Sequence, residues 1–90
     1  MIFHYQKLRK LMLDLINCLE NILPRVDIEN ALEMVEYNEF GVGYEIICEQ
    51  LYEYEIKISS DIYRKIAEIG QTMGMKESKW IFLRKLINND

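Results

Sequence analysis

Apolar residues recur every three or four positions along most of this chain, and this spacing limits the possible folds more than any other feature. Such a stripe lies on one face of an α-helix, whereas a half-buried strand shows strict alternation. The first stripe predicts an amphipathic helix over about residues 3–23, and Pro24 predicts its end because proline cannot continue a helix. The inward residues of this helix are expected to be Leu8, Leu11, Met12, Leu15, Leu19 and Ile22.

Two further helices are expected in the middle of the chain. Asp27 is placed to cap one over about residues 28–37, because its carboxylate accepts hydrogen bonds from the free amides of a first helical turn. Residues 38–43 include two glycines and are expected to form a tight turn or bent junction before a helix over about residues 42–55. The expected inward residues are Ile28, Ala31, Leu32 and Val35 in the first of these helices, and Tyr44, Ile47, Cys48 and Leu51 in the second.

The last third of the chain predicts two more helices. Ser59 or Ser60 is expected to cap the fourth, and Gly74 to end it in a left-handed conformation. The fourth apolar stripe is Ile62, Ile66, Ile69 and Met73. A fifth helix over about residues 77–88 would turn Trp80, Leu83, Leu86 and Ile87 inward and Lys79, Arg84 and Lys85 outward. The sequence therefore predicts an all-α fold, a compact bundle of about five helices that forms a single domain over residues 1–90.

Residues that usually carry catalysis are scarce. His4 is the only histidine and lies near the N-terminus. No other imidazole is present to activate a serine or cysteine as a nucleophile. Cys18 and Cys48 fall on apolar helix faces and are expected to be small buried thiols. Two cysteines and one histidine do not complete a structural zinc site, and the glutamates of the third helix lack the Glu-x-x-His partners of helical metal centres. We therefore expect no catalytic residues, no cofactor and no metal.

The distribution of charge is more informative than the net charge of −4. Residues 27–55 contain nine of the 15 acidic residues and no Lys or Arg, whereas the other 61 residues hold all 11 basic and six acidic residues. The two parts carry −9 and +5, and this acidity disfavours direct binding of nucleic acid. The chain lacks a run of about 18 apolar residues and the pattern of a signal peptide, so we expect a cytoplasmic protein without membrane contact.

Aromatic residues are interleaved with these acids. Tyr37, Phe40, Tyr52 and Tyr54 cannot all face inward at helical spacing. An acidic field raises the rate of association with a basic partner, and exposed aromatic side chains anchor the complex. We therefore expect this segment to bind a basic protein, through Glu36, Tyr37, Glu39, Phe40, Glu45, Glu49, Tyr52, Glu53 and Glu55.

The middle of the chain also carries an ordered series of residues: Ala31-Leu32-Glu33, Glu36, Asn38-Glu39-Phe40-Gly41, Glu45, Cys48-Glu49-Gln50-Leu51-Tyr52-Glu53, Ile58-Ser59, Tyr63, Lys65 and Ile66. In this series the chain resembles the MafI-like immunity proteins over about residues 27–80. These small bacterial proteins are encoded beside polymorphic toxins, including those of contact-dependent growth inhibition. The resemblance implies an all-helical inhibitor of a cognate C-terminal toxin domain, often a nuclease and in some systems a ribonuclease of the EndoU type.

Two other classes of protein fit parts of the sequence. A non-catalytic regulatory adaptor or homodimerisation module would have acidic helices that are simply solvated. A helix-turn-helix DNA binder would use the basic C-terminal helix with Lys76, Lys79, Arg84 and Lys85, although the neighbouring Trp80-Ile81-Phe82 is typical of a core. The sequence leaves open the identity of the toxin, the mode of inhibition and the oligomeric state.

Overall fold

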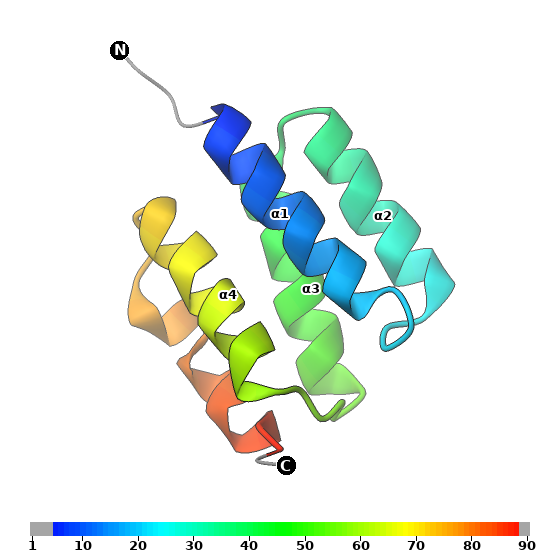
Figure 1. Ribbon diagram of the computed structural model, residues 1–90, viewed down its shortest axis with the longest axis vertical. Helices are drawn as coiled ribbons and strands as arrows, with labels where there is room; N and C mark the ends of the chain where they lie inside the picture. Colours follow the sequence, from blue (N-terminus) through cyan, green and yellow to red (C-terminus); the bar gives the residue numbers. More distant parts are fainter. Residues whose placement is uncertain (1–4, 89–90) are drawn as a thin grey trace.

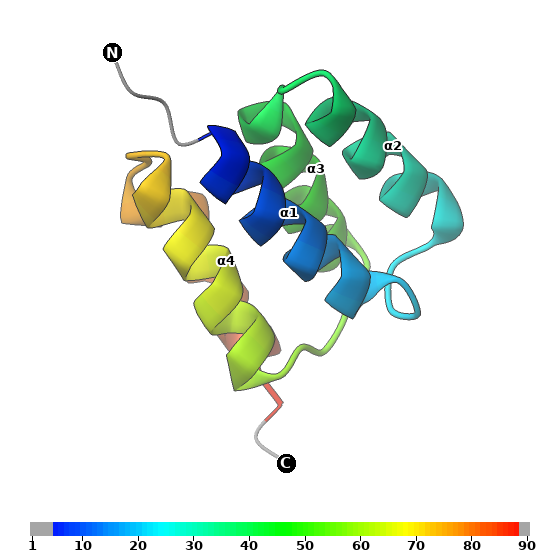
Figure 2. The ribbon, with the colours of Figure 1, turned by 45° about the horizontal axis from the view of Figure 1, so that its top comes forward.

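The computed structural model describes residues 5–88, which form four α-helices and two short 3-10 helices. In chain order these are α1 (Tyr5–Leu19), α2 (Arg25–Glu36), α3 (Phe40–Glu53), α4 (Ser60–Thr72), η1 (Glu77–Lys79) and η2 (Ile81–Leu86). α1 lies between α2 and α4 with α3 behind it (Figures 1 and 2). The most extensive packing joins α2 to α3, and the 3-10 helices pack against α3 and α4. The all-α fold expected from the apolar spacing is confirmed.

A glycine within a helix lets α3 approach α2 closely. A Cβ atom added at Gly43 would lie 3.3 Å from the Cβ of Met34 and 3.4 Å from the carbonyl oxygen of Ala31. The fully buried Tyr44 follows, and its hydroxyl donates a 2.7 Å hydrogen bond to the carbonyl oxygen of Ile66 in α4. Gly43 and Tyr44 therefore place α3 at the centre of the bundle, in contact with α2 and α4.

The expected turn over residues 38–43 is wrong, because α3 already begins at Phe40 and includes both glycines. The chain reverses at Asn38, whose φ of 62° is left-handed. The amides of Asn38 and Glu39 donate to the carbonyls of Val35 and Met34, so the reversal is made by the last turn of α2. Gly43 is needed for close packing rather than for the turn.

The first two helices also differ from their predicted bounds. α1 ends at Leu19 instead of residue 23, and the expected start at residue 3 lies outside the described residues. α2 begins at Arg25 with Pro24 as its N-cap, so the prediction that Asp27 caps this helix is wrong. Asp27 lies in the first turn and is 6% exposed, and its Oδ1 accepts a 3.0 Å hydrogen bond from Gln50 in α3. A fixed φ makes proline a good residue to begin a helix, and this moves the cap three residues earlier.

Two side chains expected in the core are exposed. Leu32 is 37% exposed, because the inward stripe of α2 is narrower than predicted and consists of Ile28, Ala31 and Val35 with Asp27. Cys18 is also exposed, because α1 buries only Met12, Leu15, Ile16 and Leu19. Leu32 directly follows the buried Ala31, and Cys18 directly precedes the buried Leu19, so both lie at the edge of an apolar helix stripe.

The last predicted segment is helical, but it forms two 3-10 helices, η1 and η2, instead of one continuous helix over residues 77–88. The buried Trp80, Leu83 and Leu86 are spaced by three residues, which is the period of a 3-10 helix and not that of an α-helix. The Trp80 ring packs against the backbone of Gly70, where an added Cβ would lie 2.4 Å from ring atoms. Close packing on α4 therefore selects the tighter helix. Lys79, Arg84 and Lys85 are exposed as expected.

The remaining helix ends agree with the sequence. The hydroxyl oxygen of Ser59 accepts a 3.1 Å hydrogen bond from the amide of Ile62, which confirms the N-cap of α4. Gly74 has a φ of 74°, and the amide of Met75 donates to the carbonyl of Gly70, so the predicted left-handed end of α4 is also confirmed. The same hydrogen-bond pattern ends α3, where Glu55 has a φ of 52°.

Candidate protein-binding surface

Eight of the nine carboxylates in residues 27–55 are exposed, the exception being Asp27. We call these eight glutamates, on α2, on α3 and just beyond their ends, the acidic surface. Glu29 pairs with Arg25 at 3.3 Å and Glu45 pairs with Lys79 at 3.5 Å. Within residues 5–88, no ion pair is made by the other six, which are Glu33, Glu36, Glu39, Glu49, Glu53 and Glu55. Most of this charge is therefore unused by the fold.

Three of these six glutamates lie where a negative charge opposes helix stability. Glu33 and Glu36 lie in the last turn of α2 and Glu53 lies in the last turn of α3, and neither turn contains a basic residue. The carboxyl end of a helix is its negative pole, so carboxylates there are unfavourable by a few tenths of a kcal/mol or more. Acids that weaken their own helices indicate a requirement other than stability.

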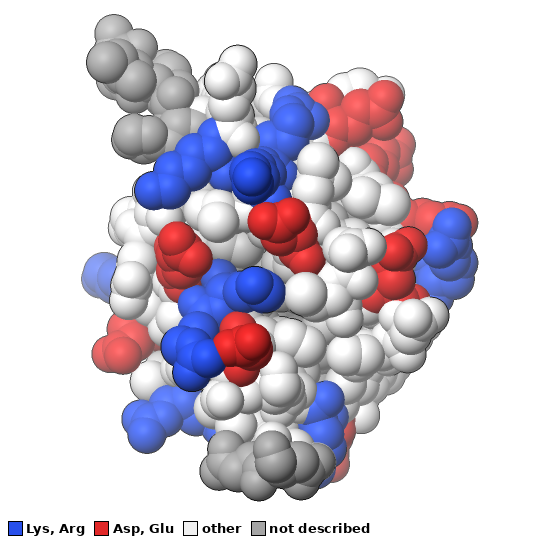
Figure 3. Space-filling model, in the orientation of Figure 1, with Lys and Arg blue, Asp and Glu red and all other residues white. Residues whose placement is uncertain are grey.

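Figure 3 shows the face of the molecule that α1 and α4 form, with the side of α2 at its right edge. Over α1 and α4, blue and red atoms alternate across the face. At the upper right, over the end of α2, red atoms gather without blue ones among them. Mixed charge is typical of a surface that is only solvated, whereas a one-signed patch attracts a partner of opposite charge.

The three predicted aromatic anchors have different environments. Tyr37 is 65% exposed at the end of α2, beside Glu36. Tyr52 is 43% exposed but is held in place, because the Phe82 ring lies edge-on at 5.2 Å and the Lys85 ammonium lies 4.5 Å from the Tyr52 ring centre. The prediction that Phe40 is an exposed anchor is wrong.

Phe40 is 4% exposed because the first turn of α3 directs it toward α1. Its ring centroid lies 5.8 Å from that of Tyr5, and the guanidinium of Arg9 lies 5.7 Å from its centre. Arg9 also donates to the carbonyl of Val35 and to the side chain of Asn38. These contacts join α1 to the end of α2, so Phe40 has a structural role at this corner.

The predicted contact residues form two groups rather than one spot. Glu36, Tyr37 and Glu39 lie where α2 ends, whereas Glu49, Tyr52 and Glu53 lie in the second half of α3 with Glu55 just beyond it. Glu45 lies between the groups. The 14 residues of α3 span roughly 20 Å at 1.5 Å per residue, so both groups fit within one interface of standard size.

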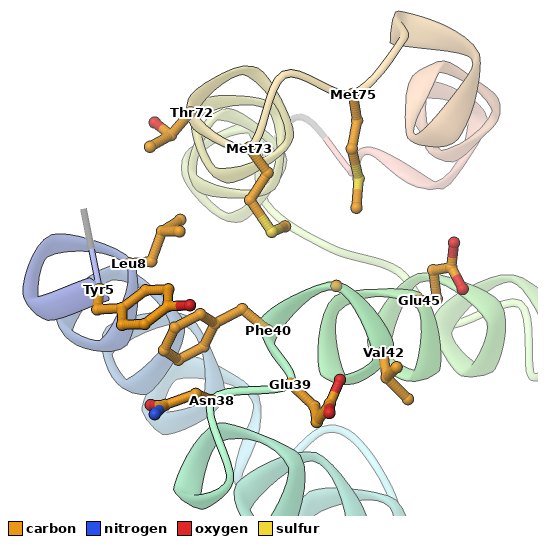
Figure 4. A pocket seen from close by; sticks show the side chains of 11 residues that line it. Tyr5, Leu8, Asn38, Glu39, Phe40, Val42, Glu45, Thr72, Met73 and Met75 are labelled. Atoms are coloured by element: carbon orange, nitrogen blue, oxygen red, sulfur yellow. The ribbon is translucent and has the colours of Figure 1, made fainter. Parts of the chain in front are cut away.

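A hollow of about 550 Å³ lies at one end of the bundle (Figure 4). Met73 and Met75 extend from the end of α4 toward Phe40 and Val42 in α3, with Tyr5 and Leu8 on the α1 side. Glu39 and Glu45 lie at its rim. Glu45 is paired with Lys79, so Glu39 is the one carboxylate among these lining residues without an ion pair in residues 5–88.

A smaller hollow, of about 390 Å³, lies between α3 and η2. It is lined by Glu49, Gln50, Tyr52, Glu53 and Phe82, three of which are predicted contact residues. Gln50 and Phe82 were not among the predicted contact residues. Phe82 could not be found from the sequence, because only the path of the C-terminal segment brings it to α3. Sequence reasoning also missed that Lys79 and Lys85 return to α3, although both were correctly expected to be exposed.

Buried titratable groups supply structure rather than reactivity. Burial raises the pKa of the Cys48 thiol to about 12, and burial likewise raises the pKa of Tyr44 above its ordinary value. Both groups therefore remain protonated at neutral pH. In the described part of the chain, no cluster of three His, Cys, Asp or Glu side chains is arranged to hold a metal ion. Nor does any helix within residues 5–88 have the length and apolar character to cross a bilayer.

Comparison of the chain with protein-family models, with curated proteins and with solved structures finds no match in any of the three.

Proposed function

We propose that this chain is an immunity protein that binds and neutralises a cognate bacterial toxin domain in the cytoplasm of the cell that makes it. The proposed toxin is a nuclease, with a ribonuclease of the EndoU type as one candidate. The observation that carries the proposal is the set of six exposed glutamates without an ion pair in residues 5–88. Three of them, Glu33, Glu36 and Glu53, lie in the last turns of α2 and α3, where they oppose the helix, yet their charge is available to a partner.

The physical argument is one of charge mimicry. A nuclease holds its substrate through a basic groove, because phosphates must be neutralised by Lys and Arg. Carboxylates on a rigid helix pair can occupy the places of those phosphates and cover the active site or the substrate groove. The field of the acidic surface would speed association, and Tyr37, which is 65% exposed, would supply buried aromatic area in the complex.

Co-expression with the toxin domain encoded beside this chain tests the proposal. We expect host cells that die with the toxin domain alone to survive with both proteins, and the two proteins to co-purify. Survival without a complex would contradict direct inhibition. A harmless neighbour, or cell death despite co-expression, would favour the alternative of a regulatory adaptor or homodimerisation module, which predicts a stable oligomer instead.

A matched pair of variants tests whether the acidic surface makes the contact. We expect Glu36→Gln/Glu39→Gln to slow association at low salt, with the difference shrinking as salt screens the charges. The control Glu68→Gln/Glu77→Gln removes the same charge from exposed positions outside the acidic surface. Equal effects of the two pairs would show that net charge, and not this surface, governs binding.

A further inference from the structure

The hollow between α3 and η2 has an aromatic wall. The rings of Tyr52 and Phe82 meet edge-on with centroids 5.2 Å apart and interplanar angle 85°, and both line the hollow. Perpendicular rings offer a π-face to a group that enters beside them. A cation placed over such a face is attracted by the electron density of the ring.

The polar groups of this hollow are acceptors. Glu49 and Glu53 are exposed, lie one helical turn apart and make no ion pair in the described part of the chain. The Nε2 of Gln50 donates to Asp27 at 3.0 Å and to the Tyr54 hydroxyl at 3.1 Å. Because both amide hydrogens are used, the Oε1 of Gln50 remains as an acceptor in the lining of the hollow.

No basic residue lines this hollow, although two lysines lie nearby. Lys85 contacts Tyr52 but lines the neighbouring hollow, with Glu53, Glu55 and Lys57. Lys79 is paired with Glu45. The lining of the hollow therefore combines negative charge, acceptors and an aromatic wall, while Lys85 covers one face of the Tyr52 ring from the neighbouring hollow.

From this combination we propose that the hollow binds an arginine side chain of the toxin domain. A guanidinium has only donors, is planar enough to stack on Phe82, and can bridge the carboxylates of Glu49 and Glu53. A lysine ammonium would gain the charge attraction but not the stacking or the forked hydrogen bonds. The proposal rests on the proposed function, since it names the partner group that one part of the acidic surface receives.

A small probe tests the hollow without the toxin. N-acetyl-arginine amide is titrated into the protein while the ring signals of Tyr52 and Phe82 are followed by NMR. N-acetyl-citrulline amide is the control, because it has a similar shape without the charge. We expect saturable shifts with the arginine probe at a Kd on the order of 1 to 10 mM and at least tenfold weaker effects with citrulline.

Variants separate a built site from a general negative field. We expect Glu49→Gln/Glu53→Gln to weaken binding of the arginine probe at least tenfold, and Phe82→Leu to weaken it severalfold with the charge unchanged. The control Glu36→Gln/Glu39→Gln removes the same charge outside the hollow and should leave probe binding within twofold. Thermal melts followed by circular dichroism establish that each variant is folded.

The same variants in the toxin complex complete the test. We expect Glu49→Gln/Glu53→Gln to speed dissociation at least tenfold, and the control pair mainly to slow association. A complex whose dissociation is unchanged by Glu49→Gln/Glu53→Gln would overturn the arginine site while leaving the proposed function supported. If the arginine probe bound selectively but the protein formed no complex with the toxin domain, the proposed function would be refuted and the hollow would be supported as an arginine site. Equal binding of arginine and citrulline would overturn the inference directly.

Discussion

Neutralising Glu33 and Glu36 should make the protein more stable. Both lie in the last turn of α2, where they face the negative pole of the helix and, three residues apart, repel each other. The pole contributes about 0.3 to 1 kcal/mol per charge, and the lower part of that range applies because both side chains are exposed. With about 0.3 kcal/mol for the repulsion, Glu33→Gln/Glu36→Gln should gain about 1 kcal/mol, since Glu and Gln have similar helix propensities.

Urea denaturation followed by circular dichroism at low and high salt measures this gain. In a thermal melt of a domain of this size, the same gain of about 1 kcal/mol corresponds to a rise in Tm of roughly 4 to 8 °C. The gain in the free energy of unfolding should shrink as salt increases. Asp61→Asn is the control of opposite sign, because Asp61 lies in the first turn of α4 and pairs with Arg64. A variant of α2 that is unchanged or less stable at low salt would refute the argument that these acids oppose the fold.

Three further predictions concern the backbone and the core. Glu55→Gly should stabilise the fold by about 1 kcal/mol in urea denaturation, because glycine adopts the φ of 52° without strain, and a loss would contradict the left-handed end of α3. Gly70→Ala should cost about 1 to 3 kcal/mol because its Cβ would overlap the Trp80 ring, whereas Gly41→Ala, with its nearest atom at 3.6 Å, should be neutral or stabilising. Burial raises the pKa of Cys48 from 9.0 to about 12, so the folded state keeps the thiol proton at a higher pH than the unfolded state does. The free energy of unfolding should therefore fall as pH rises above about 9. Cys48→Ala should flatten this fall, and an equally steep fall in the variant would exclude the thiol as its cause.

The sequence predicted those features that depend on local spacing or on a single residue type. Ile62, Ile66 and Ile69 are buried as expected, because an apolar stripe needs only periodicity to define the inner face of a helix. Ser59 and Gly74 were correct because each end of α4 requires the chemistry of one residue. The three-residue spacing of Trp80, Leu83 and Leu86 is compatible with either helix type, and only the packing of this segment on α3 and α4 distinguishes the 3-10 helix from an α-helix.

The candidate site depends on contacts that no local pattern contains. Phe40 was expected outside and is buried, because α1 passes over the start of α3 and the Tyr5 ring covers it. Tyr52 is a predicted anchor, and the C-terminal segment returns and places Phe82 and Lys85 against it. Charge counting identified the acidic segment, whereas the hollow within it exists only because residues 30 positions apart meet.

The order in which the core is completed follows from the position of Trp80, Leu83 and Leu86. These three residues are at most 3% exposed, and the Leu86 carbonyl accepts a hydrogen bond from the amide of Ile58. During synthesis α3 and α4 are made before this segment, and one side of their shared core stays uncovered until the segment has left the ribosome. A chain that stops before Trp80 would thus present its apolar interior to proteases, and molecules that contain this segment would accumulate instead.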